Sequence, residues 1–267
     1  MNRKPTYDIL GQIAIIKFDK NHSSIFKKSW ADTFLKKNPG IKTILEKSGK
    51  IQGRLRKAKT KFIAGEDNRE TIYIENGCRF KFNVDETYFS PRLSNERKLI
   101  AEDLTKKVNK NKNNILVMFA GVAPYPIVIG KFLKQANKPA LIVSNEINRK
   151  ACKYAEENVR QNKLQEYIKV IQCDAKNLPE KLRQAGLPSK YDFIMMARPN
   201  LNETFLKAAL KLSKKGTIIN YHGFGTEEKV LAEIKKDAEG KIGKITMRKA
   251  GEIAPFKYRW NCSFKVN

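Results

Sequence analysis

The second half of the sequence alternates short apolar runs with amphipathic segments, and this alternation constrains the fold more than any other feature. Five apolar runs, each followed by a segment of helical character, occupy residues 115–121, 140–146, 167–174, 191–197 and 216–223. Apolar strands that alternate with helices are typical of a parallel sheet covered on both faces. Two more runs, 244–250 and 258–266, have no helix between them, which predicts an antiparallel edge. The expected fold is therefore α/β, a Rossmann-like domain with a mostly parallel, seven-stranded sheet.

The residues ahead of this pattern have a different character and predict a separate, smaller domain. Residues 8–18 have the composition of one strand, and residues 24–47 that of a lysine-rich amphipathic helix. Short β-like runs separated by turn signals follow at 61–65, 71–75 and 79–84. We therefore expect two domains. A small α+β domain would cover residues 1–86, and the Rossmann-like domain would cover residues 87–267.

The balance of charge indicates a polyanionic partner. Lys and Arg together number 54 against 27 for Asp and Glu, which gives a formal net charge of +27. Each phosphate that a Lys or Arg neutralises releases counterions, and this release favours the binding of nucleic acid. A basic surface that binds nothing is the alternative. An anionic membrane surface is disfavoured, because no basic helix carries a continuous aromatic face.

One segment of the small domain concentrates this charge. Cations occur at Arg54, Arg56, Lys57, Lys59 and Lys61, mostly at alternate positions. In an extended chain, alternate side chains line one face, so the segment predicts an edge that faces RNA. The alternative is an exposed edge strand whose charge prevents aggregation.

Cysteine and histidine usage argues against a metal site. The four cysteines are scattered singly, with no CxxC pair, and the two histidines are too few for a histidine-based site. Single cysteines are also typical of a reducing compartment rather than of a disulfide framework. No apolar stretch is long enough for a signal peptide or a membrane span. We expect a cytoplasmic protein that binds no metal and no membrane.

The strand ends of the larger domain predict an adenosine site, because open parallel sheets bind ligands outside the carboxyl ends of their strands. The first run ends in a small-residue turn with Gly121, the second ends in Glu146 and the third in Asp174. Glu146 is placed to accept hydrogen bonds from two ribose hydroxyls, and Asp174 from an adenine amine. A dinucleotide motif would need three glycines, and this turn has one. These features suit S-adenosylmethionine. The alternative is that each acid only caps the following helix.

Several longer motifs carry a family resemblance. They are YFSPRLSNERKLIA (88–101), MFAGVAPY (118–125), NEIN (145–148), CDA (173–175) and INYHGF (219–224). In these motifs the chain resembles the archaeal and eukaryotic tRNA (guanine-37-N1) methyltransferase family, which includes wybutosine-pathway enzymes acting at the same nucleotide. The resemblance implies transfer of the methyl group of S-adenosylmethionine to guanosine 37 of tRNA, or to a tricyclic intermediate formed from it. We expect a monomer that binds the anticodon stem-loop.

The resemblance also assigns roles to individual residues. Cofactor binding falls to Tyr88, Arg92, Phe119, Gly121, Glu146, Ile147, Asp174 and Ala175. Catalytic roles fall to Arg56, Glu96 and Pro199. Glu96 would take the N1 proton of guanine and Arg56 would stabilise the charge that develops on O6. RNA contacts are expected from Arg54, Lys57, Lys59 and Arg198. The alternatives are an i,i+4 ion pair between Arg92 and Glu96, and a solvent-facing cation at Arg56.

Three departures from the family pattern bear on the substrate. Val117 stands where an acid is usual, and Ala123 where a glycine is usual. The family's Asn-Leu-Pro is Ala197-Arg198-Pro199 here, and alanine cannot orient guanine by hydrogen bonds. Either Arg198 or Asn200 takes over that role, or the target is the tricyclic intermediate. Aminocarboxypropyl transfer from the same cofactor, and RNA binding without catalysis, are the alternative functions.

Overall fold

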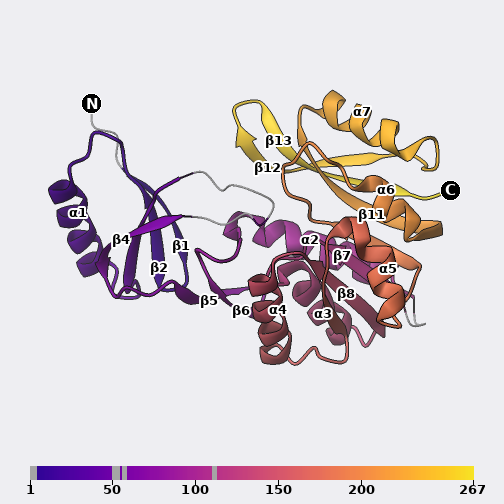
Figure 1. The fold of residues 1–267 in the computed structure, drawn as a ribbon, viewed down its shortest axis with the longest axis horizontal. Helices are drawn as coiled ribbons and strands as arrows, with labels where there is room; N and C mark the ends of the chain where they lie inside the picture. Colours follow the sequence, from indigo (N-terminus) through magenta and orange to yellow (C-terminus); the bar gives the residue numbers. More distant parts are fainter. Residues whose placement is uncertain (1–4, 50–54, 56–58, 110–112) are drawn as a thin grey trace. The chain divides into compact units, whose positions relative to one another are not determined.

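The structure, a computed structural model, describes residues 5–49, 55, 59–109 and 113–267. It divides into two compact units, Met1–Pro91 and Arg92–Asn267. The sequence predicts the boundary after residue 86, and the structure places the division after Pro91 (Figure 1).

The N-terminal unit contains one helix and two small sheets. Its elements are β1 (Thr6–Leu10), β2 (Ile13–Lys17), α1 (Ser24–Lys37), β3 (Thr43–Lys47), β4 (Thr60–Gly65), β5 (Glu70–Glu75) and β6 (Cys78–Asn83). The first four strands form a sheet in the order β1-β2-β3-β4, and β5 pairs with β6. Ala31 of α1 is buried against Ile16 of β2 and Ile44 of β3. Strand β4, which Lys59 precedes, is an edge strand of this sheet.

Two of the predicted elements in this unit are wrong. The single strand expected over 8–18 is a hairpin, because Gly11 turns the chain with a φ of +57°. A Cβ at Gly11 would lie 2.3 Å from the carbonyl oxygen of Ile72, so only glycine fits there. The helix expected over 24–47 ends at Lys37, because Pro39 disfavours helical conformation in the residue before it. The residues beyond Gly40 form β3, which pairs in parallel with β2.

The C-terminal unit alternates strands and helices as predicted. Its first half comprises η1 (Pro91–Leu93), which spans the division, α2 (Ser94–Lys107), β7 (Asn113–Met118), α3 (Pro124–Gln135), β8 (Ala140–Glu146), α4 (Arg149–Gln161) and β9 (Ile168–Gln172). Its second half comprises η2 (Ala175–Asn177), α5 (Leu178–Gln184), β10 (Tyr191–Met196), α6 (Leu206–Lys211), β11 (Ser213–Gly225), α7 (Glu227–Ala238), β12 (Thr246–Ala254) and β13 (Lys257–Lys265).

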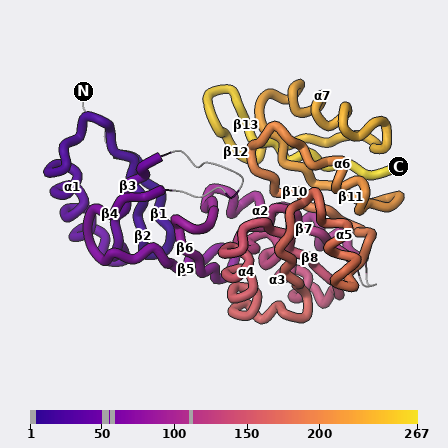
Figure 2. The backbone as a smooth tube through the Cα atoms, in the orientation of Figure 1, coloured from indigo at the N-terminus to yellow at the C-terminus, as the bar shows by residue number. Residues whose placement is uncertain are grey.

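These strands form one seven-stranded sheet in the order β12-β13-β11-β10-β7-β8-β9. Strands β11, β10, β7, β8 and β9 pair in parallel, and β13 pairs antiparallel with both of its neighbours. The predicted α/β class, with its antiparallel closing pair, is confirmed. The return of the chain from β9 across the sheet to β10 can be followed in Figure 2.

Strand β7 lies at the centre of the sheet and explains the apolar run in the sequence. Its residues from Ile115 to Met118 are fully buried, because helices cover both faces. The chain runs from β7 outward to β8 and β9 and then resumes on the other side of β7 at β10. This reversal is the switch point where open α/β sheets bind ligands, at the carboxyl ends of their strands.

No helix within the described residues is long and apolar enough to cross a membrane.

Candidate active site

The turn after β7 has an unusual backbone. Phe119, Gly121 and Ala123 all have positive φ values, of 62°, 57° and 67°. For residues other than glycine this conformation costs roughly 1–2 kcal/mol each, and such strain is typical of functional sites. The N–H of Ala120 donates to the carbonyl of Asn145 over 2.8 Å, which ties the turn to the end of β8. The structure therefore places Phe119 and Gly121 in a strained turn at the switch point.

Glu146 stands at the end of β8 beside this turn. Its Oε2 accepts a hydrogen bond from the N–H of Gly121 over 2.8 Å. Its Oε1 accepts from the N–H groups of Ile147 and Asn148 over 2.9 and 2.8 Å. The cap of α4 is the side chain of Asn148, which accepts from the N–H of Lys150. Glu146 thus does more than cap a helix, because its carboxylate is fixed between two strand ends.

Asp174 follows β9 at the next strand end. Its Oδ1 accepts from the N–H of Lys176 over 3.1 Å, so Asp174 does cap the short helix η2, as the alternative interpretation expects. The Asn145 side chain donates to the carbonyl of Cys173 over 2.9 Å and joins the end of β8 to that of β9. Ala175 is buried in the core.

These residues fit an adenosine group. Three backbone N–H groups already donate to Glu146, so its carboxylate can accept from one ribose hydroxyl and not from the two expected. Asp174 can accept from an amine, and the small turn admits a ligand to the backbone. Gly121 is the only glycine of the turn, which leaves no cradle for a pyrophosphate. Among the described residues, no group of three His, Cys, Asp or Glu side chains could hold a metal ion.

Removing either carboxylate should weaken the binding of S-adenosylmethionine. We expect Glu146→Ala and Asp174→Ala to raise its dissociation constant by about 10- to 150-fold, because a hydrogen bond to a charged group contributes about 1.5–3 kcal/mol. Affinity for tRNA should stay within error. Isothermal titration calorimetry measures both, with Glu166→Ala, an exposed acid ahead of β9, as the control. Unchanged cofactor affinity in both variants would place the cofactor elsewhere.

The loop after β10 begins with Ala197-Arg198-Pro199. Arg198 is only 2% exposed, which contradicts the predicted RNA contact. Its Nη2 donates to Glu233 over 2.9 Å and to the carbonyl of Leu201 over 3.3 Å. Its guanidinium also lies 4.9 Å from the centre of the Tyr221 ring. A carboxylate and an aromatic face stabilise this cation inside the protein, so it fastens the loop to α7 instead of facing solvent.

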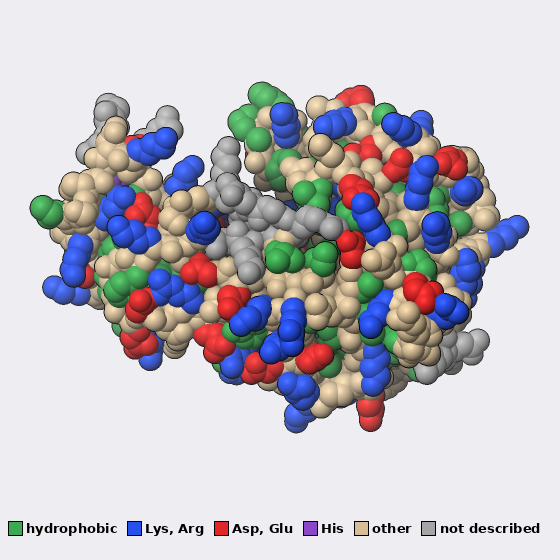
Figure 3. Space-filling model, viewed as in Figure 1, with side chains coloured by type: hydrophobic (Ala, Val, Ile, Leu, Met, Phe, Trp, Pro, Cys, Tyr) green, Lys and Arg blue, Asp and Glu red, His purple; other side chains and the backbone are tan. Residues whose placement is uncertain are grey.

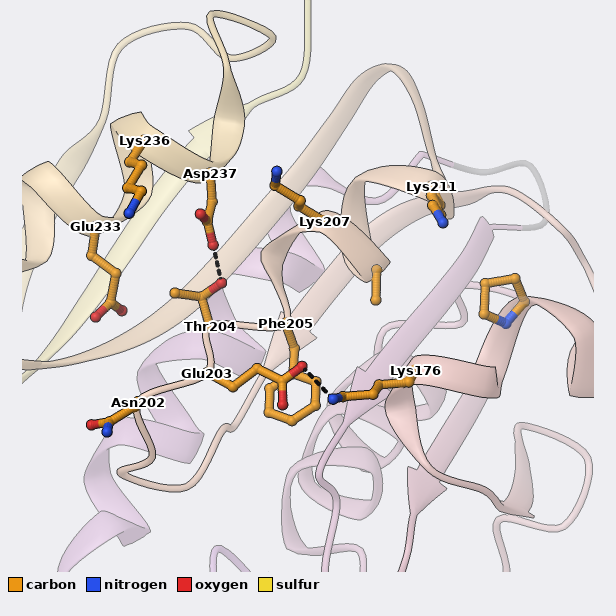
Figure 4. Close-up of a pocket in the computed structure, with 12 residues that line it drawn as sticks. Lys176, Asn202, Glu203, Thr204, Phe205, Lys207, Lys211, Glu233, Lys236 and Asp237 are labelled. Carbon is orange, nitrogen blue, oxygen red and sulfur yellow. Dashed lines mark hydrogen bonds and ion pairs between the residues drawn. The ribbon is translucent and has the colours of Figure 1, made fainter.

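An open hollow of about 660 Å³ lies beside this loop (Figure 4). Asn202, Glu203, Thr204 and Phe205 line it, together with residues of η2, α5, α6 and α7. Both lysines and acids line it, and Lys176 pairs with Glu203 over 3.1 Å. The ring centre of Phe205 lies 5.0 Å from that of Phe119. This contact connects the wall of the hollow to the turn after β7.

Glu96 lies in the first turn of α2 and is 4% exposed. Its carboxylate binds Arg248 of β12 through both oxygens and accepts from the amide of Asn261 over 2.8 Å. Nε2 of His222 lies 3.9 Å from Oε1. Burial alone would raise the pKa of the Glu96 carboxyl, but His222 and Arg248 outweigh it and hold this pKa below its usual value. Glu96 is therefore a buried, ionised carboxylate.

The remaining predicted residues lie in the N-terminal unit, at the division or outside the described residues. Tyr88 belongs to the N-terminal unit, and the exposed Arg92 opens the C-terminal one. Pro199 is buried. Arg54, Arg56 and Lys57 lie outside the described residues, and Lys59 is exposed before β4. Their predicted roles stay predictions.

Sequence reasoning missed the partners of Glu96. Arg248 and Asn261 follow it by 152 and 165 residues, and neither lies in a motif. His222 offered a signal, because it lies in INYHGF and is one of two histidines in the chain.

Comparison with known proteins agrees with the fold. Residues 71–246 match the TRM5/TYW2 methyltransferase domain, and residues 3–68 match the TYW2 N-terminal domain. The chain is 30% identical to tRNA (guanine(37)-N(1))-methyltransferase Trm5b of Pyrococcus abyssi over 98% of this chain and 75% of that protein. It is 38% identical to tRNA (guanine(37)-N(1))/4-demethylwyosine(37)-methyltransferase Taw22 of Nanoarchaeum equitans over 74% of this chain and 63% of that one.

Several solved structures are similar over 98% of the chain. The crystal structure of Pyrococcus abyssi Trm5b superposes with a TM-score of 0.77 at 31% identity, and 75% of that chain is covered. The structure of the complex of aTrm5 with tRNALeu superposes with a TM-score of 0.81 at 25% identity, and 72% of that chain is covered. The resemblance seen in the sequence motifs is confirmed, and with it the predicted class of enzyme, an S-adenosylmethionine-dependent methyltransferase. The chain belongs to the TRM5/TYW2 methyltransferase family.

Proposed function

We propose that this protein methylates N1 of guanosine 37 in tRNA, acting as a cytoplasmic monomer on the anticodon stem-loop. The observation that carries the proposal is the buried, ionised Glu96 in the same unit as a site suited to adenosine. The identity to Trm5b of Pyrococcus abyssi over nearly the whole chain supports it. So does the net charge of +27, whose cations are spread over both units in Figure 3. All four cysteines are free, as is typical of a reducing compartment.

The chemistry requires a base, because N1 of guanine carries a proton and is a poor nucleophile. Glu96 would accept that proton, and negative charge would then move toward O6. A fixed guanidinium stabilises such charge without reorganising, and Arg56, outside the described residues, is proposed for this role. S-adenosylmethionine, when bound, supplies the electrophilic methyl carbon. Glu146 and Asp174 would hold the adenosine end of this cofactor.

A tricyclic guanosine intermediate is the second candidate substrate. The 38% identity to the Nanoarchaeum equitans enzyme, whose name includes 4-demethylwyosine, favours it. Ala197 also favours it, because alanine replaces the asparagine that the family resemblance implies for orienting plain guanine. Arg198 is buried against Glu233 and does not replace that asparagine at the surface.

A direct comparison of two tRNAs tests both candidates. One tRNA carries guanosine at position 37 and the other carries the tricyclic intermediate. Mass spectrometry of the nucleosides should show a single methyl group added, and a much larger added mass would indicate aminocarboxypropyl transfer. Ala197→Asn should raise activity on the guanosine substrate if plain guanine is the natural target. If the tricyclic intermediate is the natural target, this variant should leave activity unchanged or lower it.

Asn202→Ala, in the same loop after β10, is the control for Ala197→Asn because it leaves position 197 unchanged. Turnover of neither tRNA by the wild-type protein would contradict the proposed nucleotide. It would instead favour an RNA-binding protein without activity, provided that tRNA still binds.

The basic edge of the N-terminal unit should contribute to tRNA binding. Lys59 and Lys61 are exposed at edge strand β4. Changing both to Glu should raise the dissociation constant and lower its salt dependence, by about 0.7–0.9 in the log–log slope for each phosphate that the protein no longer neutralises. Filter binding between low and moderate salt measures this slope. Lys36→Glu with Lys37→Glu, on α1, makes the same change in charge elsewhere in the unit. Equal slopes in the two double variants would contradict a role specific to β4.

A further inference from the structure

We propose that Arg248 and Asn261, on the closing hairpin of β12 and β13, are positioning residues for the transfer reaction. They hold the Glu96 carboxylate by its Oε1 and leave its Oε2 to receive a proton. This inference rests on the proposed function, in which Glu96 accepts the N1 proton. It gives the antiparallel end of the sheet, which the adenosine site does not use, a part in catalysis.

The contacts of Glu96 define which oxygen can act. Arg248 donates from Nη2 to Oε1 over 2.9 Å, and its Nη1 lies 2.6 Å from Oε2. Asn261 donates to Oε1 over 2.8 Å. A carboxylate has about four lone-pair positions, two on each oxygen. Among the described residues, hydrogen-bond donors therefore fill both positions on Oε1. Oε2 faces the Arg248 ion pair and is the oxygen that can receive a proton.

The strand register explains why these side chains converge. Arg248 of β12 pairs directly with Asn261 of β13, and Asn261 pairs directly with His222 of β11. Directly opposed residues of antiparallel strands project to the same face of the sheet. The three side chains therefore form one row across three strands, and Glu96 of α2 meets this row. A shift of one residue in either pairing would turn part of this row to the other face of the sheet.

Burial makes Arg248 the important partner. The Glu96 side chain is 3% exposed, whereas that of Arg248 is 44% exposed, so the arginine approaches a buried anion from the solvent side. Burial lowers the pKa of His222, and the nearby Arg259 lowers it further, so His222 is neutral near pH 7. The hydroxyl of Tyr125 also faces His222, 3.4 Å from its Nε2. The guanidinium of Arg248 is thus the charged partner of Glu96 near pH 7, and His222 adds to the lowering of the Glu96 pKa.

Rate measurements over a range of pH test this role. We expect Arg248→Gln to move the acidic limb of the single-turnover rate profile upward by at least about one pH unit. The reason is that burial still raises the pKa of Glu96 while its compensating cation is gone. Each unit lowers the rate about tenfold at pH values below the limb. Asn261→Ala should cause a smaller shift in the same direction, and Arg248→Lys should restore part of the loss.

The design separates positioning from support of the fold. A structural defect would lower the rate equally at every pH, and that result in Arg248→Gln would overturn the inference. Lys244→Gln, an exposed cation just ahead of β12, is the matched control and should keep the wild-type profile. Circular dichroism confirms that each variant is folded before its rate is measured.

A double variant keeps the test decisive if Arg248→Gln folds poorly. Glu96→Gln with Arg248→Gln has no uncompensated buried charge, and it should react at the rate of Glu96→Gln alone, because Arg248 acts only through Glu96. A further tenfold fall in the double variant would overturn the inference. Full activity of Glu96→Gln alone would instead contradict Glu96 as the base in the proposed function. A slow Glu96→Gln with an unchanged Arg248→Gln would reject only the positioning role.

Discussion

Glu96→Gln should lower the single-turnover rate of methyl transfer by about 10²–10⁴-fold, the range that a general base typically supplies. Glutamine preserves the shape of the side chain and can still accept from Asn261, but it cannot take a proton. Because proton transfer occurs only in the transition state, affinities for tRNA and for S-adenosylmethionine should change little. The rate is measured with enzyme in excess over tRNA, so that product release does not mask the chemical step.

The outcome for Glu96 separates two interpretations of a buried carboxylate. Loss of rate with unchanged binding supports the catalytic role. If tRNA binding fell by as much as the rate, Glu96 would instead be a structural residue that holds the hairpin of β12 and β13 in place. Glu102→Gln, a variant of another acid on the same helix, is the control and should react like the wild type.

Glu233→Ala should lower the free energy of unfolding by about 3 kcal/mol or more, because it leaves the guanidinium of Arg198 buried without a carboxylate. The side chain of Arg198 is 1% exposed, so water cannot readily replace Glu233 as its partner. Among the described residues, Nε and Nη1 of Arg198 have no hydrogen-bond partner. Tyr221 also donates to Glu233, and its phenol keeps its proton because burial raises its pKa. Urea unfolding followed by circular dichroism measures the difference.

Removing the buried cation as well should recover most of that stability. Arg198→Leu restores the residue that the family resemblance implies, and a buried ion pair replaced by apolar groups is often close to neutral. The double variant Arg198→Leu with Glu233→Ala should therefore be more stable than Glu233→Ala alone. Lys235→Ala, an exposed position on the same helix, controls for changes in helix propensity. If Glu233→Ala alone were as stable as the wild type, the pair would not fasten the loop to α7.

The candidate cofactor site was accessible from the sequence because its parts are local to strand ends. An apolar run followed by a small turn or an acid identifies Gly121, Glu146 and Asp174 one strand at a time. Parallel strands then bring those ends to one edge of the sheet, whatever the details of packing. The family motifs extended this prediction to Glu96, which lies in YFSPRLSNERKLIA.

The N-terminal unit was less predictable. Residues 8–18 are apolar enough for one strand, and only the close approach of Ile72 shows why Gly11 must turn. Residues 41–47 follow the break at Pro39-Gly40, which the prediction of one long helix ignored, and their pairing with β2 decides that they form a strand. Local propensity is weak in such short segments, and tertiary contacts override it.

The sequence by itself determined the α/β class, the order of strands and helices in the C-terminal unit and the resemblance to tRNA methyltransferases. It also predicted the adenosine-type site. These properties depend on periodicity and on short motifs, which the order of residues contains directly. Only the tertiary structure decided the environments of Arg198 and Glu96. Arginine is a residue type typical of RNA contacts, yet packing against Glu233 and Tyr221 buries Arg198. Glu96 depends on Arg248 and Asn261, which lie more than 150 residues away and meet it only through the register of three strands. Burial and ionisation depend on such distant partners, because they are set by what surrounds a side chain in space.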